Sequence, residues 1–253
     1  MAIPPLDLNP APNLRVFITG GSTGIGRATA EAYAARGARI CILDRVDIKD
    51  APEDWVCHKG SATSANDIES ALADMDNRWG GVDVAFANAG VAANKPSLDV
   101  TADEWQRVLD VNLTGVFLTF QHAGRRMVAQ KSGLLIGTSS IYGLTAGANR
   151  AAYTATKAAV ANLVRTLAIE WGPHNVRVNA ISPGYVETDM VLGLVQRGTL
   201  NMDKMKARTP LPRLGRPQDI AAMCAFLSSP GASWINGAVI PVDGGWMANG
   251  GPE

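Results

Sequence analysis

The chain of 253 residues is long enough to bury one substantial core, and this length suits a single α/β domain. Apolar residues make up 47% and charged residues 18%, which is the composition of a folded, soluble protein and excludes a disordered one. Lysine plus arginine and aspartate plus glutamate both number 23, so no basic excess points to a nucleic-acid partner.

The three cysteines, Cys41, Cys57 and Cys224, are far apart and lack the spacing of a metal site or of a disulfide framework. We therefore expect buried thiols in a reducing compartment and no metal. No apolar run reaches the length of a membrane span, and the Pro-rich residues 1–13 do not resemble a signal peptide. These features predict a cytoplasmic protein without a membrane partner, in which residues 1–13 lead into one catalytic domain at 14–253.

Short β-rich runs alternate with helical stretches along the chain. In chain order, the predicted strands are 15–19, 39–43, 55–59, 83–88, 133–139, 176–182 and 238–242. The predicted helices are 24–36, about 64–79, one from about 101, 151–171, and one from about 217. Thr101 and Glu104 have the spacing of a capping box at the third of these helices. Strands that are apolar throughout and alternate with helices predict a parallel sheet covered on both faces, with ligands at the carboxyl ends of its strands.

A glycine-rich loop directly follows the first predicted strand. Its residues are Gly20, Gly21, Ser22, Thr23, Gly24, Ile25 and Gly26. Glycines allow a tight turn and close approach to a pyrophosphate, and the following helix N-terminus offers N–H donors to phosphates. The spacing Gly-x-x-x-Gly-x-Gly differs from the Gly-x-Gly-x-x-Gly fingerprint, and no Gly-Lys-Ser/Thr follows to make a P-loop. Taken alone, the loop could be an ordinary turn.

The end of the second predicted strand indicates which dinucleotide would bind. Asp44 there could accept both adenosine ribose hydroxyls and would repel a 2′-phosphate, which favours NAD over NADP. Arg45 could soften that repulsion, so NADP stays open as the less favoured cofactor. After the fourth strand, Asn88-Ala89-Gly90 could lie against a ribose, or could form an Asx turn that leaves the sheet.

Tyr153 and Lys157 are four residues apart in a predicted helix and so share one face, with Ser140 at the exit of the preceding strand. Tyrosine has a reference pKa near ~10, and a nearby ammonium and a nicotinamide cation would both lower it. Ser140 could then hold a substrate oxygen while the Tyr153 phenolate takes its proton. Alone, the pair could be an ordinary helix pair; the nucleotide loop at the same sheet edge favours the catalytic interpretation.

With these motifs the sequence resembles the short-chain dehydrogenase/reductase family over nearly the whole chain. The matching segments are the loop 19–26, Asn88-Ala89-Gly90 (with Ala87 where a further Asn is usual), Tyr153-x-x-x-Lys157 with Ser140, and Val242-Asp243-Gly244-Gly245. By this resemblance, Asn112 is a fourth catalytic residue that holds a water linking Lys157 to solvent. The segment with Pro183, Gly184, Val186 and Thr188 would contact the nicotinamide side. The resemblance also implies a Rossmann-type, doubly wound α/β sheet of seven strands with helices on both faces, and a homotetramer.

Two departures from the family pattern concern the adenine end. Only ten residues separate Asp44 from Trp55, Pro52 among them, so the helix usual there should be shortened or lost. Ser61 and Ala62 stand where the family usually has an acid and a valine near adenine.

The substrate should lie among polar side chains near the reacting end. The candidates are Asn94, Ser140, Tyr142, Asn149, Arg150, Tyr185 and Glu187. Residues from about 185 to 208 fit no sheet pattern and are expected to form a mobile lid. Such donors and acceptors suit a sugar or polyol.

Three functions remain open. The first is NAD-dependent oxidation of a secondary alcohol, the second is carbonyl reduction in the opposite direction, and the third is nucleotide binding without turnover. The set of Asn112, Ser140, Tyr153 and Lys157 disfavours the third.

Overall fold

The structure is a computed structural model that describes residues 7–48 and 50–249. Seven strands form one sheet in the order β3-β2-β1-β4-β5-β6-β7, and every neighbouring pair is parallel. The strands are β1 (Arg15–Thr19), β2 (Arg39–Asp44), β3 (Val56–Lys59), β4 (Val84–Ala87), β5 (Gly133–Thr138), β6 (Val176–Pro183) and β7 (Val239–Val242). The predicted fold class is confirmed, and each strand end lies within one residue of its prediction.

The strand order places the loops of interest together. The chain begins in the middle of the sheet with β1, runs outward to β3, and then crosses back to β4 on the other side of β1. Thr19, the last residue of β1, is in register with Leu43 of β2 and with Ala87 of β4. The loops that follow these three strands therefore leave the sheet side by side, at the switch point where open α/β sheets bind ligands.

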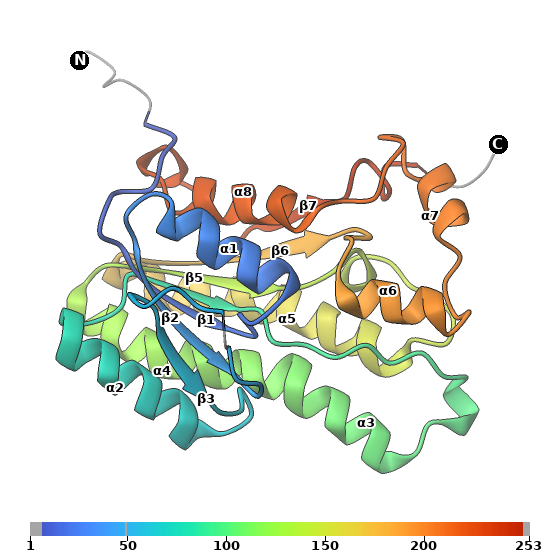
Figure 1. Cartoon of the computed structure of the whole chain (residues 1–253), viewed down its shortest axis with the longest axis horizontal. Helices are drawn as coiled ribbons and strands as arrows, with labels where there is room; N and C mark the ends of the chain where they lie inside the picture. The colour runs from blue at the N-terminus through green and yellow to red at the C-terminus, as the bar shows by residue number, and fades with distance from the viewer. Residues whose placement is uncertain (1–6, 49, 250–253) are drawn as a thin grey trace.

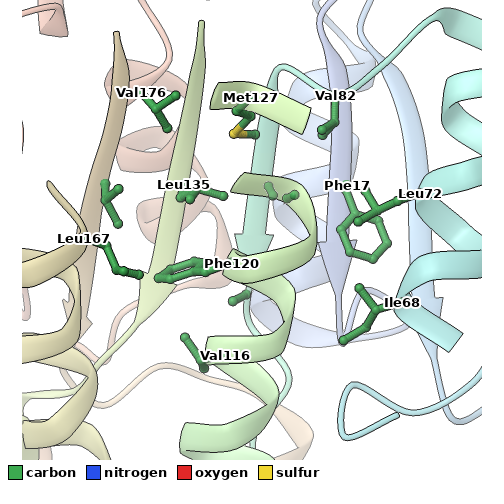
Figure 2. Packing of buried hydrophobic residues seen from close by; sticks show 14 of the residues in the cluster. Phe17, Ile68, Leu72, Val82, Val116, Phe120, Met127, Leu135, Leu167 and Val176 are labelled. Atoms are coloured by element: carbon green, nitrogen blue, oxygen red, sulfur yellow. The ribbon is translucent and has the colours of Figure 1, made fainter. Parts of the chain in front are cut away.

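Helices cover both faces of the sheet, as Figure 1 shows. One face carries α1 (Gly24–Ala34) and α8 (Pro217–Leu227), and the other carries α2 (Ala65–Trp79), α4 (Gly115–Gln130) and α5 (Ala151–Trp171). Successive residues of β1 point to opposite faces, so Val16 and Ile18 pack with α1 and α8 while Phe17 packs with α2 and α4. Figure 2 shows Phe17, Leu72 and Phe120 in the apolar layer between the sheet and the helices α2, α4 and α5.

An unbroken helical stretch leads from α3 to α4. The predicted capping box at α3 (Ala102–Leu109) is confirmed: the Thr101 hydroxyl accepts from the Glu104 amide, and the Glu104 carboxylate accepts from the Thr101 amide. Between α3 and α4, residues Asp110–Thr114 form a π-helical segment, a feature often found at functional sites. Asn112 lies in this segment with its side chain fully buried.

The connection from β2 to β3 contains no helix among its described residues, 45–48 and 50–55, which confirms the expected loss. Trp55 is buried there, and the Arg27 guanidinium of α1 lies 5.0 Å from the centroid of its ring. This cation–π contact packs the connection between β2 and β3 against α1.

The segment expected to be a lid contains two short helices, α6 (Asp189–Gln196) and α7 (Met202–Arg208), on the right-hand side of Figure 1. The described residues also contain four short 3-10 helices: Ser97–Asp99, Ile141–Gly143, Gly172–His174 and Pro230–Ala232. In the predicted N-terminal lead-in, the Asp7 carbonyl accepts from the Gly231 amide at 2.8 Å, while residues 1–6 lie outside the described part. None of the helices within residues 7–48 and 50–249 is long and apolar enough to cross a membrane.

Candidate active site

A cleft of about 350 Å³ runs across the carboxyl ends of β1, β2, β4, β5 and β6. The residues predicted to bind a cofactor that line it are Gly20, Ser22, Thr23, Gly24, Ile25, Asp44, Arg45, Ser61, Ala62, Asn88, Ala89, Gly90, Tyr153, Lys157, Pro183, Gly184, Val186 and Thr188. Other lining residues, which sequence reasoning missed, include Leu43, Gly60, Thr63, Val91, Val111, Thr138, Ser139, Asp189, Met190 and Val191. The fold therefore brings segments from most of the chain to one cleft.

Three features shape the glycine loop: left-handed backbone angles, the lack of room for a β-carbon, and a hydrogen bond from Asn88. Gly20 and Gly24 have φ of +70° and +56°, the left-handed region that favours glycine. Gly26 lies beneath the cleft, where a β-carbon would come within 2.1 Å of the Gly20 carbonyl oxygen. The Asn88 amide also donates to that oxygen, at 2.7 Å, and so ties the loop after β4 to the loop after β1.

The N-terminus of α1 faces the cleft with its backbone donors uncapped. The side chain of the N-cap residue, Thr23, makes no capping hydrogen bond, and the first turn contains no acidic residue. The free N–H groups and the positive end of the helix dipole therefore suit a diphosphate. A dinucleotide fits these residues. Its phosphates need backbone N–H donors, and glycines without a β-carbon allow the phosphates to come close to that backbone.

Asp44 is fixed on the cleft wall by two backbone donors. The Ser22 amide donates to one carboxylate oxygen at 3.0 Å, and the Val46 amide donates to the other at 3.3 Å. The carboxylate thus lies against the glycine loop, where it can meet the adenosine ribose of a dinucleotide. Arg45 lines the same cleft and is exposed.

Tyr153 and Lys157 line the other end of the cleft from one face of α5. The Lys157 ammonium donates to the Thr138 carbonyl at 2.7 Å, and burial lowers its pKa to about 8. Burial also raises the pKa of Tyr153, while a hydrogen bond with Ser140 and the charge of Arg150 act in the opposite direction. Ser140 lies at the exit of β5, where its hydroxyl accepts from the Tyr142 amide at 3.1 Å.

Asn112 does not line the cleft; it lies behind the cleft wall and next to Lys157. Its side-chain oxygen accepts from the Val91 amide at 2.8 Å, and its amide donates to the Val91 carbonyl at 2.9 Å. A β-carbon on Gly90 would lie 3.4 Å from the Asn112 oxygen and 3.7 Å from the Lys157 nitrogen. All four predicted catalytic side chains are therefore gathered around one end of the cleft.

Comparison with known proteins gives a consistent assignment. A family model described as Enoyl-(Acyl carrier protein) reductase matches residues 20–247. A cis-4-hydroxycyclohexanecarboxylate dehydrogenase of Sinomonas cyclohexanicum is 42% identical over 249 residues, which cover 91% of this chain and 95% of that protein. The chain belongs to the short-chain dehydrogenase/reductase family. It is thus an oxidoreductase of a family that acts on CH–OH groups and binds a nicotinamide dinucleotide.

Other short-chain dehydrogenase/reductase relatives differ in their cofactors. An NAD-dependent glycerol dehydrogenase of Listeria innocua is 34% identical, with 90% of this chain and 92% of that protein covered. The crystal structure of a gluconate 5-dehydrogenase from Burkholderia cenocepacia, in complex with NADP and tartrate, superposes with a TM-score of 0.89 at 30% identity. That superposition covers 96% of this chain and 98% of the other.

A smaller pocket of about 70 Å³ adjoins the larger cleft of this short-chain dehydrogenase/reductase and shares with it Ser140, Tyr153, Gly184, Met190 and Val191. The predicted substrate residues that line it are Asn94, Ser140, Tyr142, Arg150 and Tyr185. Two candidates line neither pocket. Asn149 is exposed with φ of +63°, and Glu187 is exposed with its amide donating to the Gly215 carbonyl.

An aromatic cluster beside this pocket includes a residue that sequence reasoning missed. The Tyr142 and Tyr185 hydroxyls are 2.7 Å apart, and both rings meet Trp246 edge-on, with centroids 5.9 and 6.2 Å away. The Arg208 guanidinium of α7 lies 3.8 Å from the centroid of the Trp246 ring. Nothing in local sequence linked Trp246 to Tyr142 and Tyr185, which lie 104 and 61 positions earlier, because only the fold brings the C-terminal segment to this site.

Proposed function

We propose that this chain oxidises a secondary alcohol to the carbonyl compound, with NAD as the acceptor and Tyr153 as the general base. The observation that carries the proposal is that the Tyr153–Lys157 face of α5 and the Asp44 carboxylate line one continuous cleft. A proton-handling pair and a ribose-binding acid at opposite ends of one site are what dehydrogenation with a dinucleotide requires.

In this proposal, each catalytic side chain has a distinct task. Ser140 holds the substrate oxygen, and the Tyr153 phenolate takes the hydroxyl proton. The Lys157 ammonium lies 5.7 Å from the centroid of the Tyr153 ring and favours the phenolate over the phenol. Asn112 helps hold a water that passes the proton from Lys157 to solvent. The bound dinucleotide supplies the hydride acceptor.

Asp44 supports NAD over NADP, because a fixed carboxylate repels a 2′-phosphate. Arg45 at the same wall is the feature that could admit NADP. Polar side chains in the small pocket support a sugar or polyol substrate. The names of two relatives extend the candidate substrates to glycerol and hydroxycyclohexanecarboxylate. We also expect a cytoplasmic homotetramer with residues 185–208 as its lid.

A second candidate is a carbonyl reductase in which Tyr153 donates the proton instead. The reductase description of the matching family model favours it. A non-catalytic nucleotide-binding protein is disfavoured by the four side chains gathered at the cleft.

One absorbance experiment separates the three functions. Purified protein is given NAD or NADP with a panel of polyols, sugar acids, hydroxycyclohexanecarboxylates and simple secondary alcohols, and NADH or NADPH with the matching ketones. NAD-linked oxidation supports the proposal, and turnover confined to ketones supports the reductase. Binding of NADH without turnover across the panel would support the non-catalytic alternative.

A further inference from the structure

The small pocket contains a positive charge that no acidic side chain neutralises. Arg150 stands directly before α5, three residues ahead of Tyr153. Its Nη1 donates to the Asn94 side-chain oxygen at 2.6 Å, and its guanidinium lies 4.9 Å from the centroid of the Tyr142 ring. Both partners are neutral, and within residues 7–48 and 50–249 no carboxylate forms an ion pair with Arg150.

Five other arginines of the described residues are neutralised by a carboxylate, unlike Arg150. Arg15, Arg27, Arg78, Arg126 and Arg213 each pair with an aspartate or glutamate. A guanidinium that lines a pocket without such a partner, yet is held by neutral neighbours, is already positioned for an anion from solution. One Nη1–H is taken by Asn94, and the fork keeps further N–H donors for a planar, two-oxygen acceptor such as a carboxylate.

The rest of the pocket wall suits a compact apolar group. Ile141, Met190 and Leu194 supply aliphatic surface, and the rings of Tyr142 and Tyr185 supply aromatic surface. The polar side chains of the pocket can bind hydroxyls, and a saturated ring would in addition cover this apolar surface.

We propose that Arg150 binds the carboxylate of an alicyclic hydroxy acid, whose ring fills the small pocket and whose hydroxyl meets Ser140 and Tyr153. The inference rests on the proposed function, since it names the substrate class of that same site. Asn94 and Tyr142 hold the guanidinium in place before the substrate arrives, so little side-chain entropy is lost on binding. The reverse reaction takes the corresponding oxo acid.

The test compares three substrates that differ only in the group facing Arg150. Wild-type protein with NAD is assayed on hydroxycyclohexanecarboxylate isomers, on their carboxamides, and on cyclohexanol. The variants are Arg150→Met, Arg150→Lys and, as a matched control, Arg36→Met, an exposed arginine outside both pockets. Thermal melting and NADH affinity check that each variant is folded.

We expect the wild type and Arg36→Met to prefer the carboxylate over the carboxamide in kcat/KM. Arg150→Met should lower kcat/KM for the carboxylate by about 10- to 100-fold more than it lowers kcat/KM for cyclohexanol, because only the carboxylate loses a charge-assisted contact. For the carboxylate, kcat/KM of Arg150→Lys should lie between those of the wild type and Arg150→Met. Lysine keeps the positive charge but lacks the paired N–H donors of the guanidinium. Cyclohexanecarboxylate, which has no hydroxyl, should bind the NADH complex of the wild type and not that of Arg150→Met in a fluorescence titration.

The inference and the function it rests on fail in different ways. Equal turnover of carboxylate, carboxamide and cyclohexanol by the wild type, or an equal loss on all three in Arg150→Met, would overturn the role of Arg150 and leave alcohol oxidation standing. Oxidation of polyols alone would overturn the substrate class. Turnover of none of these alcohols, despite measurable NADH binding, would overturn the proposed function as well.

Discussion

The Lys157 ammonium nitrogen lies 5.7 Å from the centroid of the Tyr153 ring, one helical turn away on α5. This relationship couples a buried cation to a phenol whose pKa burial raises. Without a favourable charge nearby, a buried phenol would stay protonated at neutral pH and could not act as a base.

Tyr153→Phe should lower kcat for alcohol oxidation by about 100- to 10,000-fold, because it removes the group that takes the proton. NADH affinity should stay close to that of the wild type in a fluorescence titration. Tyr33→Phe is the matched control: it also removes a buried hydroxyl, which donates to the Cys224 carbonyl at 2.9 Å, but far from the cleft. Comparable kcat values in the two variants would refute the assignment of Tyr153.

Lys157 should make the stability of the cofactor-free protein depend on pH. Its pKa is about 8 in the folded chain, against an ordinary value of 10.5, so between these pH values the unfolded chain binds more protons. The free energy of unfolding should therefore rise with pH across this window, by up to about 1.4 kcal/mol per pH unit from this group. Urea unfolding of wild type and Lys157→Met should differ in this slope. Lys204→Met, at an exposed position on α7, should keep the wild-type slope.

Most strands and α5 could be predicted because their own residues decide them: apolar runs form buried strands, and glycine and proline follow the end of α5. The helices of the lid were missed although Thr188 and Asn201 cap them, since α6 and α7 are too short to show a clear period. The π-helical segment could not be foreseen, because its extra residue leaves no local pattern. Contacts such as Asn94 with Arg150 depend on the fold alone.

Asp44→Ala should raise the ratio of kcat/KM with NADP to that with NAD by at least about tenfold, since it removes a carboxylate that would repel a 2′-phosphate. Initial rates at varied cofactor concentration measure the ratio. Asp47→Ala is the control, because Asp47 is a nearby exposed acid that pairs with Lys59 and lies outside the cleft. An unchanged ratio in Asp44→Ala would remove the argument for NAD.

Gly26→Ala should abolish dinucleotide binding and lower the melting temperature, because the new β-carbon would lie 2.1 Å from the Gly20 carbonyl oxygen. The backbone cannot relieve this contact without moving the loop that faces the phosphates. Gly37→Ala is the control, because it introduces backbone strain without a steric clash. The φ of Gly37 is +79°, and no atom lies within 4 Å of the added β-carbon. We expect Gly37→Ala to cost about 1 kcal/mol of stability and to bind NADH normally. NADH binding by Gly26→Ala with wild-type affinity would contradict the assigned loop geometry.

Asn112 should matter for proton transfer beyond its structural hydrogen bonds. Asn112→Ala leaves the Val91 amide and carbonyl unpaired, which should lower the free energy of unfolding by about 1–3 kcal/mol. Asn179→Ala is a closely matched control, because Asn179 on β6 is equally buried and its amide group also bonds two backbone groups, the Ala238 amide and the Ile235 carbonyl.

Both variants should therefore lose similar stability in urea unfolding, but only Asn112→Ala should lose kcat, since only Asn112 adjoins Lys157. A relay role also predicts a changed solvent deuterium isotope effect on kcat in Asn112→Ala and none in Asn179→Ala. If kcat and the isotope effect respond alike in the two variants, Asn112 serves to hold the segment after β4, and the proton must leave Lys157 by another path.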